Sequence, residues 1–200
     1  MYNAEGSGVK SFFRRAWRVA RWPLGILLVL YIGLVIYRIP AVTEQQRAVE
    51  VIAQIHAQRL TMDDVDGKHL PPPPDPKLVD ATVEGIDANA NGIRDDVELA
   101  IFKKYPNDIK IRAAELQYAM ALQNELTNVF DSGTLVAAIQ QEGRANVCVL
   151  DSKRTDEIEK LMFNTNMRKQ AREDIYQKFM TSYALPNANY CDIDPKTLVN

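Results

Sequence analysis

The side chains with the clearest chemistry lie in one short segment, from Asp87 to Glu98, which reads DANANGIRDDVE. Oxygen-bearing residues alternate with small ones at its start, a glycine follows, and an acid closes it. This spacing matches the pattern D-x-[DN]-x-[DN]-G-x5-E at every defined position. Calcium takes about six to eight oxygen ligands, and alternate side chains turned inward can supply them. The segment therefore predicts a calcium-binding loop.

The predicted ligands are the side-chain oxygens of Asp87, Asn89, Asn91, Asp95 and Glu98 and the backbone carbonyl of Ile93. Gly92 permits the sharp turn that a residue with a Cβ would resist. Glu98 reaches back with both oxygens from the first turn of a helix, and Asp95 binds directly or through water. The alternative is a metal-free turn, in which Asp95 and Asp96 favour the helix N-terminus electrostatically.

The loop resembles EF-hand loops and, more closely, the single calcium loops of bacterial surface proteins and thrombospondin type 3 repeats. It departs from them at Arg94, which stands where an apolar residue usually helps to pair one hand with a second. The preceding residues 76–85 read as extended, so we expect a loop followed by a helix, without a paired hand. Two asparagine ligands and Arg94 keep the negative charge low, which predicts a dissociation constant on the order of 10⁻⁴–10⁻³ M.

A second feature is the apolar run from Trp22 to Tyr37, which holds no charged residue. As a helix it spans about 24 Å, somewhat less than the roughly 30 Å hydrocarbon core of a bilayer. Arg21 and Arg38 bracket the run and can extend their side chains to the interfaces. The run predicts a single transmembrane anchor. A cleaved signal peptide and a buried soluble helix are the alternatives, although Arg38-Ile39-Pro40-Ala41-Val42 is a poor cleavage site.

The charges of the chain are distributed unevenly. Six of the 24 Lys and Arg residues, but only one of the 26 Asp and Glu residues, lie within the first 40 positions. The positive-inside rule then places the N-terminus in the cytoplasm and the remaining, acidic part outside the inner membrane, in the periplasm. An acidic domain also argues against nucleic acid as a partner, because phosphate contacts need clustered Lys and Arg.

Composition predicts a mainly α fold in successive parts: a basic cytoplasmic segment (1–21), the anchor (22–39), a stalk helix (40–61), a Pro-rich linker (62–86) and a helical domain opened by the calcium loop (87–200). Thr43 and Gln46 resemble a capping box that begins the stalk helix, whose predicted face holds Val49, Ile52, His56 and Leu60. The proline run 71–74 favours a semi-rigid spacer, and a docking site for an SH3-like module is the alternative. After the loop, apolar spacing predicts about four helices, over 96–105, 107–130, 135–150 and 156–183, with a possible break at 164–166.

The chain has two cysteines, Cys148 and Cys191. In an exported domain such a pair most simply forms a disulfide, which by the chain-entropy model contributes roughly 4 kcal/mol for a loop of this length. It would attach the C-terminal tail to the helix that carries Cys148. Free thiols or a redox pair are the alternative, although no C-x-x-C sequence is present.

No catalytic motif is recognised in the sequence: it contains no G-x-S-x-G, no H-E-x-x-H and no Gly-rich phosphate loop. The anchor and loop together resemble exported proteins of Gram-negative bacteria, a resemblance that implies no activity. The leading hypothesis is therefore a membrane-anchored periplasmic calcium-binding structural or interaction protein, whose partner is another envelope protein. The alternatives are an enzyme or enzyme subunit that acts on envelope polymers with its acidic residues, and a calcium-responsive regulator.

Overall fold

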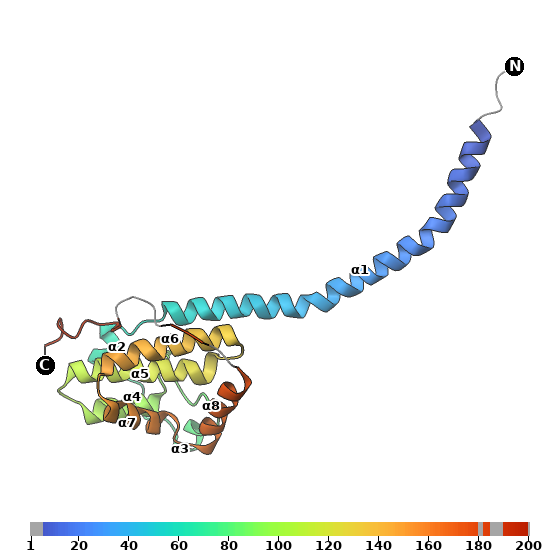
Figure 1. Ribbon diagram of the computed structural model, residues 1–200. Coiled ribbons are helices and arrows are strands. Elements are labelled where there is room, and N and C mark those ends of the chain that lie inside the picture. The colour runs from blue at the N-terminus through green and yellow to red at the C-terminus, as the bar shows by residue number, and fades with distance from the viewer. Residues whose placement is uncertain (1–5, 180–181, 185–189, 200) are drawn as a thin grey trace. The chain divides into compact units, whose positions relative to one another are not determined.

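The computed structural model describes residues 6–179, 182–184 and 190–199, and within these ranges it contains eight helices and no strand (Figure 1). The prediction of a mainly α fold is confirmed. The predicted cytoplasmic segment and C-terminal tail lie partly outside the described residues. The helices are α1 (Gly6–Ala57), α2 (Met62–Asp66), α3 (Pro76–Val79), α4 (Asp95–Lys104), α5 (Ile109–Asn128), α6 (Ser132–Val149), α7 (Ser152–Met162) and α8 (Asn166–Lys178).

The chain divides into two compact units, residues 1–47 and residues 48–200. The described residues of the first unit form α1 as far as Arg47. Among the described residues, α1 is the one helix long and apolar enough to cross a membrane, by its length and composition, and its span begins at Arg21. Every side chain from Trp22 to Tyr37 is exposed. A signal sequence would pass the same test of length and composition.

Helix α1 continues through the predicted boundary between anchor and stalk. We expected Thr43 to cap a separate stalk helix, but Thr43 and Pro40 both lie inside α1. The Thr43 hydroxyl donates to the backbone carbonyls of Ile39 at 3.2 Å and Pro40 at 2.8 Å. A hydroxyl bonded to the preceding turn is compatible with a continuous helix, whereas a capping hydroxyl would accept from the following turn.

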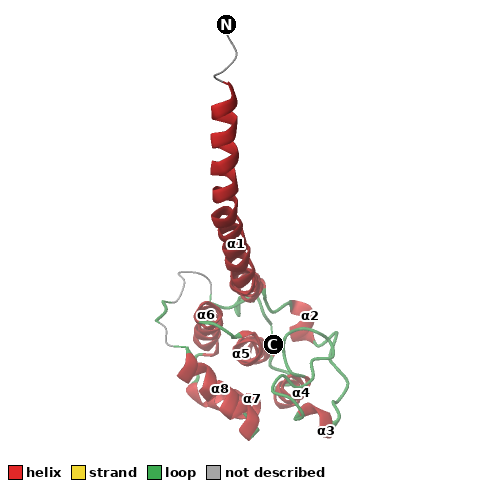
Figure 2. Cartoon of the chain, turned by 90° about the vertical axis from the view of Figure 1, so that its right-hand side faces the viewer, coloured by secondary structure: helices red, strands yellow, loops and turns green. Residues whose placement is uncertain are grey.

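The core of the second unit is built around α5. Every residue of α5 from Arg112 to Leu126 is buried, and Figure 2 shows α5 surrounded by α4, α6, α7 and α8. Apolar residues cover a broad face of this segment, which suits a helix at the centre of a core. The core includes Val97 and Ile101 of α4 and Ile158 and Met162 of α7.

The segment 62–86, predicted as a Pro-rich linker, belongs to the second unit. It contains α2 and α3, and the side chains of Val65, Pro71 and Val79 are buried. Buried arginines of the helices donate hydrogen bonds to its backbone carbonyls. Arg112, for example, donates to the Val65 carbonyl at 3.2 Å. A segment with few internal backbone hydrogen bonds needs such partners when it packs against a core. The second unit therefore begins earlier than the predicted boundary at residue 87.

The last turns of α1 also lie in the second unit, where they bury a different face from the predicted one. Ala48 and Ile55 are buried, whereas Val49 and His56 are exposed. Of the predicted stripe, Leu60 is buried, but it follows the end of α1. Both stripes have helical spacing, so the choice between them depends on how the helix docks and not on its sequence alone.

Cys148 of α6 and Cys191 of the C-terminal segment lie within bonding distance, with their Cα atoms 5.2 Å apart. The residue after this pair, Asp192, accepts hydrogen bonds from the backbone N–H of Leu60 at 3.1 Å and from Arg144 of α6 at 2.6 Å. Asp192 also donates its own backbone N–H to Gln117 of α5 at 2.9 Å. The C-terminal segment is thus attached to α5, α6 and the residues that follow α1.

Candidate metal centre

The segment Asp87–Glu98 lies between α3 and α4, and its last four residues form the start of α4. Its backbone turns through two residues with positive φ, Ala90 at 57° and Gly92 at 84°. The Asp87 carboxylate accepts the backbone N–H groups of Asn91 at 3.2 Å and Gly92 at 2.8 Å. A carboxylate that takes several N–H groups across a glycine turn fixes the start of the loop against its middle.

Glu98 meets the two asparagines inside this turn. Its carboxylate accepts the side-chain amide of Asn91 at 3.0 Å and that of Asn89 at 3.1 Å, one on each oxygen. Glu98 itself is only 1% exposed. Three of the predicted ligands therefore converge from separate positions of the loop. Rotating either amide by half a turn exchanges its nitrogen for its oxygen, so the same side chains can present oxygens to a cation.

Asp95 adds a second buried carboxylate. Its Oδ1 accepts the backbone N–H of Ala88 at 2.9 Å, and its Oδ2 is buried without a hydrogen-bond partner among the described residues. Burial is the main reason that the pKa of Asp95 is raised, and it also raises the pKa of Glu98 to about 7. Two buried acids and an unpartnered carboxylate oxygen cost free energy unless a cation offsets them.

The donor set of the loop fits a hard cation. Its side chains offer only carboxylate and amide oxygens, which calcium prefers, and no thiolate or imidazole of the kind that zinc prefers. Among the described residues, no group of three or more His, Cys, Asp or Glu side chains is arranged to hold a metal ion. A shell at this loop therefore depends on Asn89, Asn91 and a backbone carbonyl such as that of Ile93, whose side chain is fully buried in the core.

Two buried arginines beside the loop were not predicted from the sequence. Arg94, between two predicted ligands, is fully buried and donates to the carbonyls of Leu161 and Met162 at the end of α7. Arg168 of α8 is also fully buried and donates to backbone carbonyls of the segment before the loop. Gly85, with a φ of 71°, leaves the space that both arginine side chains use. In a sequence, a charged residue is normally interpreted as a surface residue. The only sign that Arg94 is buried was its place in the motif, where an apolar residue is usual.

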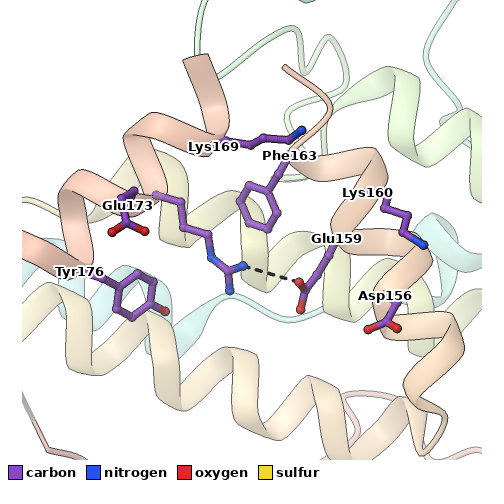
Figure 3. A pocket seen from close by; sticks show the side chains of 8 residues that line it. Asp156, Glu159, Lys160, Phe163, Lys169, Glu173 and Tyr176 are labelled. Atoms are coloured by element: carbon purple, nitrogen blue, oxygen red, sulfur yellow. Dashed lines mark ion pairs between the residues drawn. The ribbon is translucent and has the colours of Figure 1, made fainter. Parts of the chain in front are cut away.

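A second group of acids lies outside the loop, beside a groove of about 510 Å³ between α7 and α8 (Figure 3). Arg172 lines this groove and binds three carboxylates, with its nitrogens 2.9 Å from Glu125, 3.5 Å from Glu159 and 3.8 Å from Glu142. Figure 3 shows the side chains of Tyr176, Phe163 and Glu159 along this groove, and the Arg172 guanidinium lies 4.4 Å from the centre of the Phe163 ring.

Burial raises the pKa of the Glu142 carboxyl to about 7 and also raises that of Glu125. Glu125 is fully buried behind Arg172, and one of its oxygens has no hydrogen-bond partner among the described residues. Glu159 is the most exposed of the three acids, and it also accepts the Tyr118 hydroxyl at 2.9 Å. Because one arginine occupies the centre of these acids, the arrangement favours an internal charge network over a metal site.

Comparison with known proteins adds no identification, because no family model, curated protein or solved structure matches the chain. The candidate site is therefore assessed on its own geometry. The loop brings four side chains, Asp87, Asn89, Asn91 and Glu98, into one hydrogen-bonded cluster, with Asp95 alongside.

Proposed function

We propose that this chain is a single-pass inner-membrane protein whose periplasmic domain binds one calcium ion at Asp87–Glu98 and acts as a structural or interaction protein in the cell envelope. The observation that carries the calcium assignment is the buried Glu98 carboxylate between Asn89 and Asn91, beside an Asp95 oxygen that has no hydrogen-bond partner among the described residues. The role of calcium in this proposal is to offset buried negative charge and to hold the start of α4 against the loop.

The location rests on separate features. The apolar, exposed part of α1 has the composition of a membrane span, and the basic residues before it favour a cytoplasmic N-terminus. The pairing of Cys148 with Cys191 suits an oxidising compartment such as the periplasm. The function in the envelope is then binding, most simply to another envelope protein, since no catalytic motif is recognised in the sequence.

The test is the melting temperature of the full chain in detergent micelles, measured in millimolar calcium and in chelator. With a dissociation constant near 10⁻⁴ M, millimolar calcium adds about 1–2.5 kcal/mol of stability by mass action. For a domain of this size that corresponds to a rise of about 3–8 °C. Equal melting temperatures in both buffers would remove the metal from the proposal.

Glu98→Gln identifies the site within this experiment. The variant keeps a side chain of the same size but loses the charge that calcium needs, so we expect the calcium-dependent rise to disappear. Glu115→Gln is the matched control, because Glu115 is also 1% exposed and burial also raises the pKa of its carboxyl to about 7. It lies on α5, outside the loop, and should retain the full calcium-dependent rise.

The groove between α7 and α8 favours one alternative, an enzyme or enzyme subunit that acts on envelope polymers. Buried acids whose pKa is raised, next to a groove, are a common setting for acid–base chemistry. Glu159 is the candidate acid because it is half-exposed and lines the groove. Release of soluble fragments from purified cell-wall polymers by the wild type but not by Glu159→Gln would establish this alternative, and no release by either would remove it.

A further inference from the structure

Arg94 replaces the residue through which a calcium loop usually pairs with a second loop, and the structure gives it a different partner. Its side chain is fully buried, and its backbone lies between Ile93 and Asp95, two predicted ligands. Asp96, on the other side of Asp95, binds the same guanidinium with both carboxylate oxygens. The charge of Arg94 is therefore fixed in place by the first turn of α4.

The rest of the Arg94 guanidinium reaches the end of α7. Its Nη2 donates to the Leu161 carbonyl at 2.7 Å, and its Nη1 donates to the Met162 carbonyl at 3.1 Å. The last four carbonyls of a helix lack partners within that helix, so a buried cation with several donors is a strong cap for them. The end of α7 is thus held by Arg94, the residue at which this loop departs from the usual motif.

Arg168 makes a parallel attachment from α8 to the segment that leads into the loop. Its Nη2 donates to the Val79 carbonyl at 2.6 Å, its Nε donates to the Val83 carbonyl at 3.0 Å, and its Nη1 binds Asp80 at 2.6 Å. The two arginines meet over Gly85, where an added Cβ would collide with Arg94 and come within 3.1 Å of Arg168. The loop and the residues before it are therefore attached to both α7 and α8. The region where these helices meet, residues 159–168, is called the α7–α8 corner below.

This corner forms the walls of the groove shown in Figure 3. Phe163 follows Met162 directly, and its ring stacks against the Arg172 guanidinium at 4.4 Å. A shift in the carbonyls that Arg94 caps would move Phe163, and with it one wall of the groove. Contacts of this kind, between buried groups with few alternative partners, are able to carry a coupling free energy between two sites.

We propose that Arg94 couples the calcium loop to the α7–α8 corner, so that calcium binding orders the end of α7 and the groove beside it. This inference rests on calcium binding at Asp87–Glu98. Arg94 acts as a positioning residue, because it contacts the frame of the loop and the helix end and not the ion. The chain then responds to calcium at a surface distinct from the loop itself.

Hydrogen exchange of the full chain in detergent micelles tests the coupling, with millimolar calcium or chelator as the only difference. We expect calcium to slow exchange in the loop and, by at least about fivefold, in peptides that cover residues 159–168. Slower exchange in the loop with no change in residues 159–168 overturns the coupling but leaves calcium binding intact. No change in the loop overturns the proposed function itself, so the two failures are distinguishable.

Arg94→Met identifies the route. We expect it to keep calcium-dependent protection of the loop and to lose at least about fivefold of the protection in residues 159–168. Arg112→Met is the matched control, because Arg112 is also a buried arginine that donates to carbonyls, those of Val65, Tyr105 and Pro106. It should lower stability without altering the calcium-dependent difference.

Arg94→Lys gives a second, milder variant that keeps the charge, and it should restore part of the protection that Arg94→Met loses. Since the readout is the difference between calcium and chelator, a purely structural role of Arg94 would leave that difference unchanged. Calcium-dependent protection of residues 159–168 that persists in either folded variant contradicts the route through Arg94. If neither variant folds, the wild-type comparison still decides whether the loop and corner are coupled.

Discussion

The side-chain amide of Gln58 lies against the backbone of Gly92. Gln58 is the first residue after α1, and its amide nitrogen is 3.5 Å from the carbonyl oxygen of Asn91. Its amide oxygen accepts a hydrogen bond from Asn124 of α5 at 2.7 Å. The loop Asp87–Glu98 is therefore in contact with the residue that directly follows α1, and α5 holds that residue in position.

The first prediction concerns Gly92→Ala, which should lower the stability of the second unit. Gly92 has a φ of 84°, a region that costs other residues roughly 1–2 kcal/mol, and a Cβ there would collide with the Gln58 amide. We expect a loss of about 2–4 kcal/mol in the free energy of unfolding, measured by urea denaturation, and weaker calcium binding.

The double variant Gln58→Ala/Gly92→Ala separates the two causes of this loss. Removing Gln58 relieves the collision but not the backbone strain, so the double variant should lose less stability than the sum of the two single variants. An additive result would show that Gln58 does not restrict position 92.

The second prediction concerns the paired cysteines. Replacing both Cys148 and Cys191 by Ser frees the C-terminal segment, whose Asp192 binds Leu60 and Arg144. We expect a loss of roughly 2–4 kcal/mol in the free energy of unfolding and faster hydrogen exchange in residues 190–199. Reductant should give the wild type the stability of the double variant and leave the variant unchanged; equal stability of the oxidised and reduced wild type would contradict the prediction.

The helical segments after residue 95 were predictable from sequence, because they need only apolar spacing and local caps. Asp108, for example, accepts the backbone N–H of Ile111 at the start of α5. The start of α6 lies at Ser132, before the predicted residue 135, because Asp131 caps the helix by accepting the backbone N–H of Thr134. Such caps involve residues close together in the sequence, so they can be predicted from it. The packing of residues 62–86 is not local, since it depends on Arg112 and Arg168 from distant helices.

The candidate site divides in the same way. The predicted ligands from Asp87 to Glu98 form a motif with fixed spacing, which a single sequence can reveal. Arg94 was recognised only as a departure from the motif. Its partner, the end of α7, lies 67 residues away in sequence, and nothing in the local pattern names it. Long-range pairing of a charged side chain with backbone carbonyls is set by the tertiary fold.

The third prediction concerns pH and Glu115, whose pKa burial raises from an ordinary value of 4.5 to about 7. Between these values the folded chain keeps a proton that the unfolded chain releases, so the free energy of unfolding falls as pH rises and stays lower above pH 7. Urea denaturation in chelator at pH 5 and pH 8 should show this fall. Glu115→Gln should reduce it by about 1–3 kcal/mol, whereas replacement of the exposed Glu173 by Gln should not.

The fourth prediction concerns Asp95→Asn, for which the effect should depend on calcium. The Asp95 side chain keeps one oxygen on the Ala88 N–H, and asparagine retains that acceptor. In chelator the variant removes a buried charge whose other oxygen has no partner among the described residues, so its melting temperature should equal or exceed that of the wild type. In millimolar calcium the wild type should gain more, because the variant has lost one of the carboxylates available to the ion.

The difference between the two melting temperatures should therefore shift in favour of the wild type when calcium replaces chelator. Asp131→Asn serves as the control, since it neutralises an acid at the start of α6 while asparagine preserves the cap. It should shift the melting temperature equally in both buffers. If Asp95→Asn lowers stability equally with and without calcium, Asp95 contributes only to the hydrogen bonds of the loop. The buried charge at this position would then have no role in binding a metal ion.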